Sequence, residues 1–160
     1  KKKIKNNLLL LCNLNDYKPF IEILNQCNLK HFNITVLPHP INRNRTIVDF
    51  KKNFLNKFSV GNSTNRINLI KNADYVVFAN SSLGFQLAIN KKNVIRIFDK
   101  KEIPTCDLNQ EIPTTNNYKT FQKFLKMKSI KQNPKILIKN YFYKYDNKSS
   151  MRFVEKLKSI

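Results

Sequence analysis

The chain has 160 residues, 41% of them hydrophobic, and a formal net charge of +20 from 30 Lys and Arg against 10 Asp and Glu. This length suits one domain or one lobe of a larger enzyme, and the hydrophobic fraction is too high for a disordered chain. With 2 Gly and 6 Pro, collagen-like and Gly/Pro-rich classes are excluded. No apolar run approaches the ~18 residues of a membrane span. The chain begins with lysines and without Met, so we expect a segment of a longer protein.

Lysine carries most of the positive charge. The sequence has 25 Lys, 5 Arg and 24 Asn, spread from end to end. Proteins that bind specific nucleic acids rely on Arg for bidentate contacts to bases and phosphates, and no aromatic-interleaved basic stripe is present. We therefore expect a lysine-rich surface that attracts anionic substrates or an anionic inner-membrane surface, and no specific nucleic acid. A basic module that binds nucleic acid remains the alternative outside the enzymes.

The cysteines and histidines are few. Cys12, Cys27 and Cys106 show no CxxC spacing, and an odd count without a secretion signal indicates a reducing cytoplasm. Cys12 and Cys27 resemble small core residues. With two histidines only, His31 and His39, we expect no metal site and no resident cofactor.

Strand-like and helix-like segments alternate along the first hundred residues. Continuous apolar or β-branched runs predict buried strands at Leu8–Leu14, Asn33–Leu37, Tyr75–Ala79 and Asn93–Phe98. Helical patterns lie between them: one that Asn15 and Asp16 can cap, with Pro19 in its first turn; one over about Thr46–Phe58; one over Asn65–Asn72 that Ser63 or Thr64 can cap; and one that follows Asn80–Ser82. This alternation predicts an α/β fold with a Rossmann-like parallel sheet and helices on both faces.

The pattern changes after Asp99. We expect a single domain over residues 1–160, in which 1–100 form the sheet and its helices, 101–115 an irregular loop and 116–160 a helical C-terminal tail. The tail pieces are predicted at Asn116–Met127, Pro134–Tyr145 and Ser149–Ile160, where apolar residues recur at helical spacing.

A lone histidine stands at the end of the second predicted strand. In Leu37-Pro38-His39-Pro40, two prolines restrict the loop that presents His39. Ligands of parallel sheets bind at the carboxyl ends of strands, so His39 and Pro40 are candidates for ligand contact. A turn with a surface histidine is the alternative, and the residues alone leave both open.

The third predicted strand leads into Asn80-Ser81-Ser82-Leu83-Gly84. A helix N-terminus carries free N–H groups and about half a positive charge, so it suits an anion, and Ser81 and Ser82 add two hydroxyls. Gly84 lies in the first turn, where a small residue permits close approach and where helices disfavour glycine by about 1 kcal/mol. We predict a phosphate site here. An ordinary serine N-cap would explain one serine, but neither the pair nor the glycine.

Other polar residues near this edge are weaker candidates. Arg43 and Arg45 follow the histidine loop and are either phosphate ligands or a solvated pair. Asp99 ends the fourth predicted strand and is a candidate for a ribose or base contact. Asp74 better suits a turn. No carboxylate pair, HExxH, GxGxxG or P-loop pattern occurs.

These residues together resemble a known family. His39-Pro40 after a strand, Ala73-Asp74 before a strand that ends in Asn80-Ser81-Ser82-Leu83-Gly84, and then Lys91-Lys92-Asn93-Val94-Ile95 are similar to the C-terminal half of GT-B glycosyltransferases. The similarity is greatest to bacterial sialyltransferases with HP and SS motifs. Capsule and lipopolysaccharide transferases and the CDP-glycerol glycerophosphotransferases of teichoic acid synthesis share the layout.

The resemblance implies the donor-nucleotide-binding lobe of a transferase in surface polysaccharide synthesis. His39 would contact the donor phosphate and assist departure of the nucleotide, and Ser81 and Ser82 would hold the same phosphate. Many relatives carry Glu after the glycine to contact ribose, whereas this chain has Gln86, so the donor is left open between a CMP-activated sugar and a CDP-activated group. The family's acidic catalytic base belongs to an N-terminal acceptor lobe that this segment lacks.

The resemblance also implies partners and a location. A nucleotide-sugar donor and a glycan or glycolipid acceptor are expected, in the cytoplasm or at the inner face of the membrane. A sugar-nucleotide epimerase of the same fold is a further alternative, although it would be expected to have Ser-Gly-Gly in place of Ser81-Ser82-Leu83-Gly84.

Overall fold

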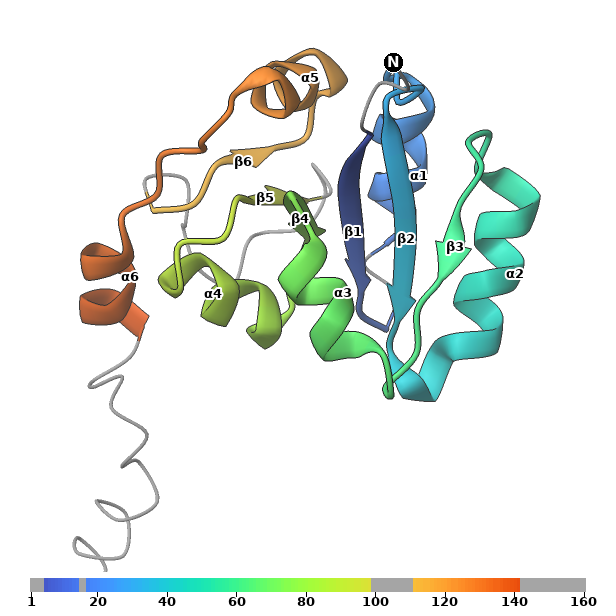
Figure 1. Cartoon of the computed structure of the whole chain (residues 1–160), viewed down its shortest axis with the longest axis horizontal. Coiled ribbons are helices and arrows are strands. Elements are labelled where there is room, and N and C mark those ends of the chain that lie inside the picture. The colour runs from blue at the N-terminus through green and yellow to red at the C-terminus, as the bar shows by residue number, and fades with distance from the viewer. Residues whose placement is uncertain (1–4, 15–16, 99–110, 142–160) are drawn as a thin grey trace, which may run out of the picture.

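The computed structural model describes residues 5–14, 17–98 and 111–141 (Figure 1). The strands are β1 (Asn6–Cys12), β2 (Phe32–Pro38), β3 (Ser59–Val60), β4 (Tyr75–Phe78), β5 (Val94–Ile97) and β6 (Thr114–Thr115). The helices are α1 (Lys18–Asn25), the single 3-10 turn η1 (Pro40–Asn42), α2 (Arg43–Asn53), α3 (Arg66–Asn72), α4 (Ser82–Ile89), α5 (Tyr118–Lys126) and α6 (Pro134–Tyr141).

The six described strands form one parallel sheet in the order β3-β2-β1-β4-β5-β6. The chain runs outward from β1 to β3 and then returns to place β4 on the other side of β1. This is the Rossmann-like α/β architecture that the alternation of elements predicts. Its topological switch point lies between β1 and β4, and ligands of such sheets bind in the crevice outside the strand ends at that point.

Two apolar layers hold the helices against the sheet. Successive residues of β1 alternate between them: Leu8 and Leu10 belong to one cluster, Leu9 and Leu11 to the other. The first layer contains the buried faces of α1, α2 and α5. The second contains those of α4 and α6, and the partly buried Leu69 and Ile70 of α3 pack against it. Both faces of the sheet are therefore covered, which explains why its central strands are continuously apolar.

Helix α2 ends earlier than the sequence pattern predicts. The predicted segment extends to Phe58, whereas the helix ends at Asn53 and Phe54 is extended (φ −97°, ψ 121°). The rings of Phe50, Phe54 and Phe58 nevertheless pack together, with centroids 5.4–5.9 Å apart. The four-residue spacing of these rings continues the helical period beyond the helix, so the sequence pattern overextends it.

Short strands and helix caps differ most from prediction. The predicted loop 101–115 contains β6, which pairs with β5, and β3 was not predicted at all. Two-residue strands are too short to show a period. The N-cap residues are Tyr17 for α1 and Asn65 for α3, in place of the predicted Asn15 or Asp16 and Ser63 or Thr64.

The C-terminal tail is described in part. Helix α5 lies within the predicted Asn116–Met127, and α6 begins at the predicted Pro134. The predicted helix Ser149–Ile160 and the end of the predicted Pro134–Tyr145 lie outside the described residues. Among the helices that the structure describes, none has both the length and the apolar character needed to cross a membrane.

Candidate functional site

A pocket of about 310 Å³ opens at the carboxyl ends of the central strands. It is lined by the end of β1, by the loop after β2, by the first turn of α4 and by the approach to α3. The lining residues are Leu11, Cys12, Asn13, Leu37, Pro38, His39, Pro40, Ser63, Arg66, Ser81, Ser82 and Leu83. The pocket thus lies at the topological switch point, and it brings together the two motifs that the sequence places at separate strand ends.

The sheet itself fixes the loop that carries His39. The His39 N–H donates to the Cys12 carbonyl at 2.8 Å and so extends the pairing of β1 with β2 by one residue. Pro38 ends β2, and Pro40 begins η1. The ring of His39 is half-buried, and its Nδ1 accepts a 3.4 Å hydrogen bond from the Ile41 N–H. The neutral ring then carries its proton on Nε2, which can donate to a ligand.

Ser81 occupies the N-cap position of α4, but its side chain makes no capping hydrogen bond. The first bond of the helix runs from the Phe85 N–H to the Ser81 carbonyl, at 3.3 Å. The N–H groups of the first turn have no partner within the helix, as at any helix N-terminus. Ser81 is half-buried and Ser82 exposed, and both line the pocket. Two serines and the first turn of α4 therefore line one pocket, which suits an anion.

Gly84 and Gln86 lie on the same helix but do not line the pocket. Gly84 is buried, and a Cβ built on it would come 2.3 Å from carbons of the Phe78 ring. Packing thus explains the glycine, because α4 approaches β4 too closely at this position for a side chain. Gln86 is exposed, and its predicted contact with ribose remains a prediction.

The other sequence candidates lie elsewhere. The Arg43 Nη1 donates to the Gly61 carbonyl at 2.7 Å and so ties the start of α2 to the end of β3. Asp74 lies in the bend before β4, as predicted for a turn residue, and its Oδ2 accepts the N–H of Asn7 in β1 at 2.7 Å. Asp99 lies outside the described residues. Neither Arg43 nor Arg45 lines the pocket.

Sequence reasoning missed Arg66, Ser63 and Asn13, which also line the pocket. Arg66 begins α3 and is exposed. Among the lining residues that the structure describes, Arg66 carries the one permanent charge and none is acidic. The described lining therefore favours an anionic ligand through a cation, three serine hydroxyls and a helix N-terminus. The sequence holds no short-range signal for Arg66, because the crossover from β3 to β4 decides where it lies.

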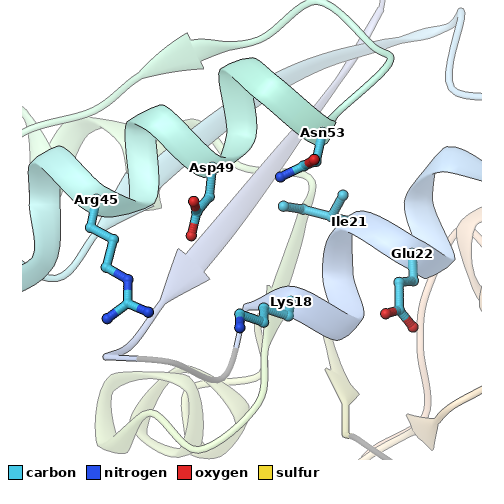
Figure 2. A pocket seen from close by; sticks show the side chains of 6 residues that line it. All are labelled: Lys18, Ile21, Glu22, Arg45, Asp49 and Asn53. Atoms are coloured by element: carbon cyan, nitrogen blue, oxygen red, sulfur yellow. The ribbon is translucent and has the colours of Figure 1, made fainter.

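A second pocket, of about 450 Å³, lies between α1 and α2 (Figure 2). It is lined by Lys18, Ile21, Glu22, Arg45, Asp49 and Asn53. Figure 2 shows cationic and anionic side chains distributed around it. This pocket is larger, but its lining charges are of both signs. We therefore place the candidate site at the switch point.

The described residues include no group of three or more His, Cys, Asp or Glu side chains placed to hold a metal ion. The groups that the switch-point pocket offers a ligand are the hydroxyls, N–H groups, imidazole and guanidinium described above.

The sheet order and flanking helices define a Rossmann-like lobe of the GT-B type. The chain is similar to two solved structures of the wall teichoic acid polymerase TagF, both of a histidine-to-asparagine variant with CDPG. One has a TM-score of 0.50 and 16% identity over 96% of this chain. The other has a TM-score of 0.53 and 15% identity over 98%. The chain spans 41% of the TagF chain in each.

At these identities the likeness is one of fold. No family model matches the chain. No curated protein matches it in sequence.

Proposed function

We propose that this chain is the donor-binding lobe of a GT-B transferase that uses a cytidine-nucleotide donor in the synthesis of a surface polymer. The observation that carries the proposal is the switch-point pocket: His39 and the serines at the N-terminus of α4 line one cavity, and none of its described lining residues is acidic. Oriented donors in such a crevice match the requirements of a nucleotide phosphate.

The residues would act on the leaving nucleotide. Both a CMP-activated sugar and a CDP-activated group release CMP, so negative charge develops on a phosphate oxygen in either reaction. His39 would donate from Nε2, and Ser81 and Ser82 from their hydroxyls and nearby N–H groups. Each such donor, fixed in place before the reaction, can lower a barrier by ~2–4 kcal/mol. The acceptor's catalytic base would come from the other lobe of the enzyme.

Between the two donors we favour the CDP-activated group over the CMP-activated sugar. The solved structures that this chain resembles are of a teichoic acid polymerase with CDPG. The lining also includes Arg66, a cation that a second phosphate would pair with. A CDP-glycerol-type glycerophosphotransferase therefore becomes the leading proposal, with the sialyltransferase-like reading as its competitor.

Location and acceptor follow from this proposal. The enzyme would meet its donor in the cytoplasm and a glycan or glycolipid acceptor at the inner face of the membrane. A net charge of +20 would favour anionic headgroups, at about 1 kcal/mol for each well-placed lysine.

The test is a calorimetric titration at physiological salt with CDP-glycerol, CDP, CMP, UDP and a mixed oligonucleotide. The wild-type protein is compared with His39→Ala and Ser81→Ala. His31→Ala and Ser129→Ala are the matched controls, because both residues are exposed and lie outside the pocket.

We expect cytidine nucleotides to bind selectively, and His39→Ala to weaken binding about tenfold, or roughly 1.4 kcal/mol. The two controls should bind like the wild type. Stronger binding of CMP than of CDP would favour the sialyltransferase-like donor. Binding of the oligonucleotide alone, unchanged by His39→Ala, would replace the proposal with a nucleic-acid-binding module.

A further inference from the structure

Arg96 is the largest side chain that the structure buries completely, with 1% of its surface exposed. It lies in β5, between apolar neighbours that are themselves buried. A buried guanidinium is retained at the expense of desolvation, and an apolar side chain of similar volume is often equally stable or more so. Filling the core therefore does not explain why an arginine occupies position 96.

The contacts of Arg96 lead to the loop before α4. Its Nε donates to the Ala79 carbonyl at 3.0 Å, and its Nη2 donates to the Asn80 Oδ1 at 2.9 Å. Ala79 and Asn80 are the two residues that precede Ser81. The buried cation thus grips the backbone and the side chain of the segment that leads into the proposed phosphate site.

Asn80 joins this grip to the first strand. The Asn13 Nδ2 donates to the Asn80 carbonyl at 3.3 Å, and Asn13 follows β1 and lines the pocket. Arg96, Asn80 and Asn13 therefore connect β5, the loop after β4 and the loop after β1 in one hydrogen-bonded series. These are the elements on either side of the topological switch point.

A packing contact of Phe78 supports the same first turn of α4. Arg96 is paired in register with Phe78, so the two side chains share one face of the sheet. The Phe78 ring contacts α4 at Gly84. Two adjacent residues of β4 and β5 thus fix the start of α4, one by hydrogen bonds before it and the other by packing within its first turn.

We propose that Arg96 is a positioning residue that acts through Asn80 to hold the hydroxyls and N–H groups of Ser81 and Ser82 in place for a nucleotide phosphate. The inference rests on the proposed function and adds a residue to it. Arg96 need not touch the ligand. It makes the donors of α4 converge before the ligand arrives, and so removes the need to order them on binding.

The test measures CDP affinity by calorimetry for Asn80→Ala, Arg96→Met, Arg96→Lys and the double variant Asn80→Ala/Arg96→Met. Asn80 is exposed, so its variant is expected to fold even where a change at buried Arg96 does not. Arg45→Met and Asn44→Ala are matched controls, since both residues are exposed on α2. Hydrogen exchange of the Phe85 amide, whose bond to Ser81 begins the helix, is followed without ligand.

We expect Asn80→Ala and Arg96→Met each to weaken CDP binding by about tenfold. The double variant should be no weaker than Arg96→Met, because both changes cut one connection. Arg96→Lys should restore part of the affinity, and the Phe85 amide should exchange faster in Asn80→Ala while amides of α5 do not change.

The outcomes separate the two proposals. If the wild type binds CDP and Asn80→Ala binds it equally well, the positioning role is wrong and the proposed function stands. The same conclusion follows if the two losses multiply in the double variant. If the wild type binds no cytidine nucleotide, the proposed function fails and the positioning role fails with it.

Discussion

The ring of Phe78 lies directly beneath Gly84, so that a Cβ on Gly84 would come 2.3 Å from two ring positions. Phe78 is completely buried, and its ring also packs edge-on against Phe85 at a centroid distance of 5.2 Å. The ring therefore has no room to move away. This contact sets how closely the first turn of α4 approaches β4. It thereby also sets the position of Ser81 and Ser82 in the lining of the pocket.

Replacing Gly84 with Ala should destabilise the protein. Overpacking against a fixed ring costs about 1–3 kcal/mol, which exceeds the gain of about 1 kcal/mol from helix propensity. Gly61→Ala is the matched control, because its Cβ would meet Leu69 Cδ1 at 2.5 Å, the movable end of a side chain. Urea unfolding should show a larger loss for Gly84→Ala than for Gly61→Ala. Equal losses would mean that the Phe78 ring does not limit the approach of α4.

Most of the fold was predictable from the sequence, because the apolar patterns of its strands and helices are local and recur along the chain. Strand β4 and the helix after Asn80 are where the pattern indicates, and β1 (Asn6–Cys12) begins and ends two residues before its predicted span. Strands β3 and β6 have two residues each, and only pairing with neighbours makes them strands. A two-residue strand spans a single period, so it shows no alternation by which it could be predicted.

The two motifs of the candidate site were predictable from the sequence, but the residues that surround and support them were not. His39 and Ser81 each follow a strand, and the rule for parallel sheets brings strand ends together. The crossover from β3 to β4 brings Arg66 to the pocket. In the sequence, Arg96 is one residue within a predicted apolar strand, with no pattern that indicates its role. Such contacts depend on the distance between segments far apart in the chain, which a single sequence does not encode locally.

Arg66→Ala should lower affinity for CDP more than for CMP, if a second phosphate pairs with the guanidinium. Because Arg66 is exposed, we expect a loss of about 1 kcal/mol, or roughly fivefold in Kd. The loss should shrink at high salt, where exposed charges are screened. Lys71→Ala, an exposed cation at the far end of α3, is the control. Equal weakening by both substitutions would point to general charge in place of a contact in the pocket.

Tyr17 gives a prediction for alkaline stability. Its hydroxyl donates to the Asp49 Oδ2 at 2.6 Å, and burial together with that carboxylate raises the pKa of Tyr17 to about 12. A group with a raised pKa stabilises the fold below its unfolded value, here about 10, and loses that contribution as the pH rises toward 12. The free-energy difference between wild type and Tyr17→Phe should therefore fall by on the order of 1–2 kcal/mol over this range.

Urea unfolding at pH 9 to 11.5 checks this expectation. Asp49→Asn is a useful comparison, because it removes the carboxylate but leaves the burial that is the main cause of the raised pKa. Its alkaline loss should lie between those of the wild type and Tyr17→Phe. A Tyr17→Phe variant whose stability declines as steeply as that of the wild type would show that Tyr17 does not titrate in this range.

A comparison of Ser81 with Asn117 distinguishes a serine that binds a ligand from a residue that only caps a helix. Both occupy N-cap positions, but the Asn117 Oδ1 accepts the N–H groups of Lys119 and Thr120, at 2.8 and 3.4 Å, whereas the Ser81 side chain caps nothing. Asn117→Ala should therefore lower the free energy of unfolding by about 1 kcal/mol, and Ser81→Ala by well under half of that. In calorimetry the order should reverse, with nucleotide affinity reduced by Ser81→Ala and unchanged by Asn117→Ala. If Ser81→Ala instead loses stability and keeps its affinity, Ser81 is an ordinary cap, and the phosphate site must be sought elsewhere in the pocket.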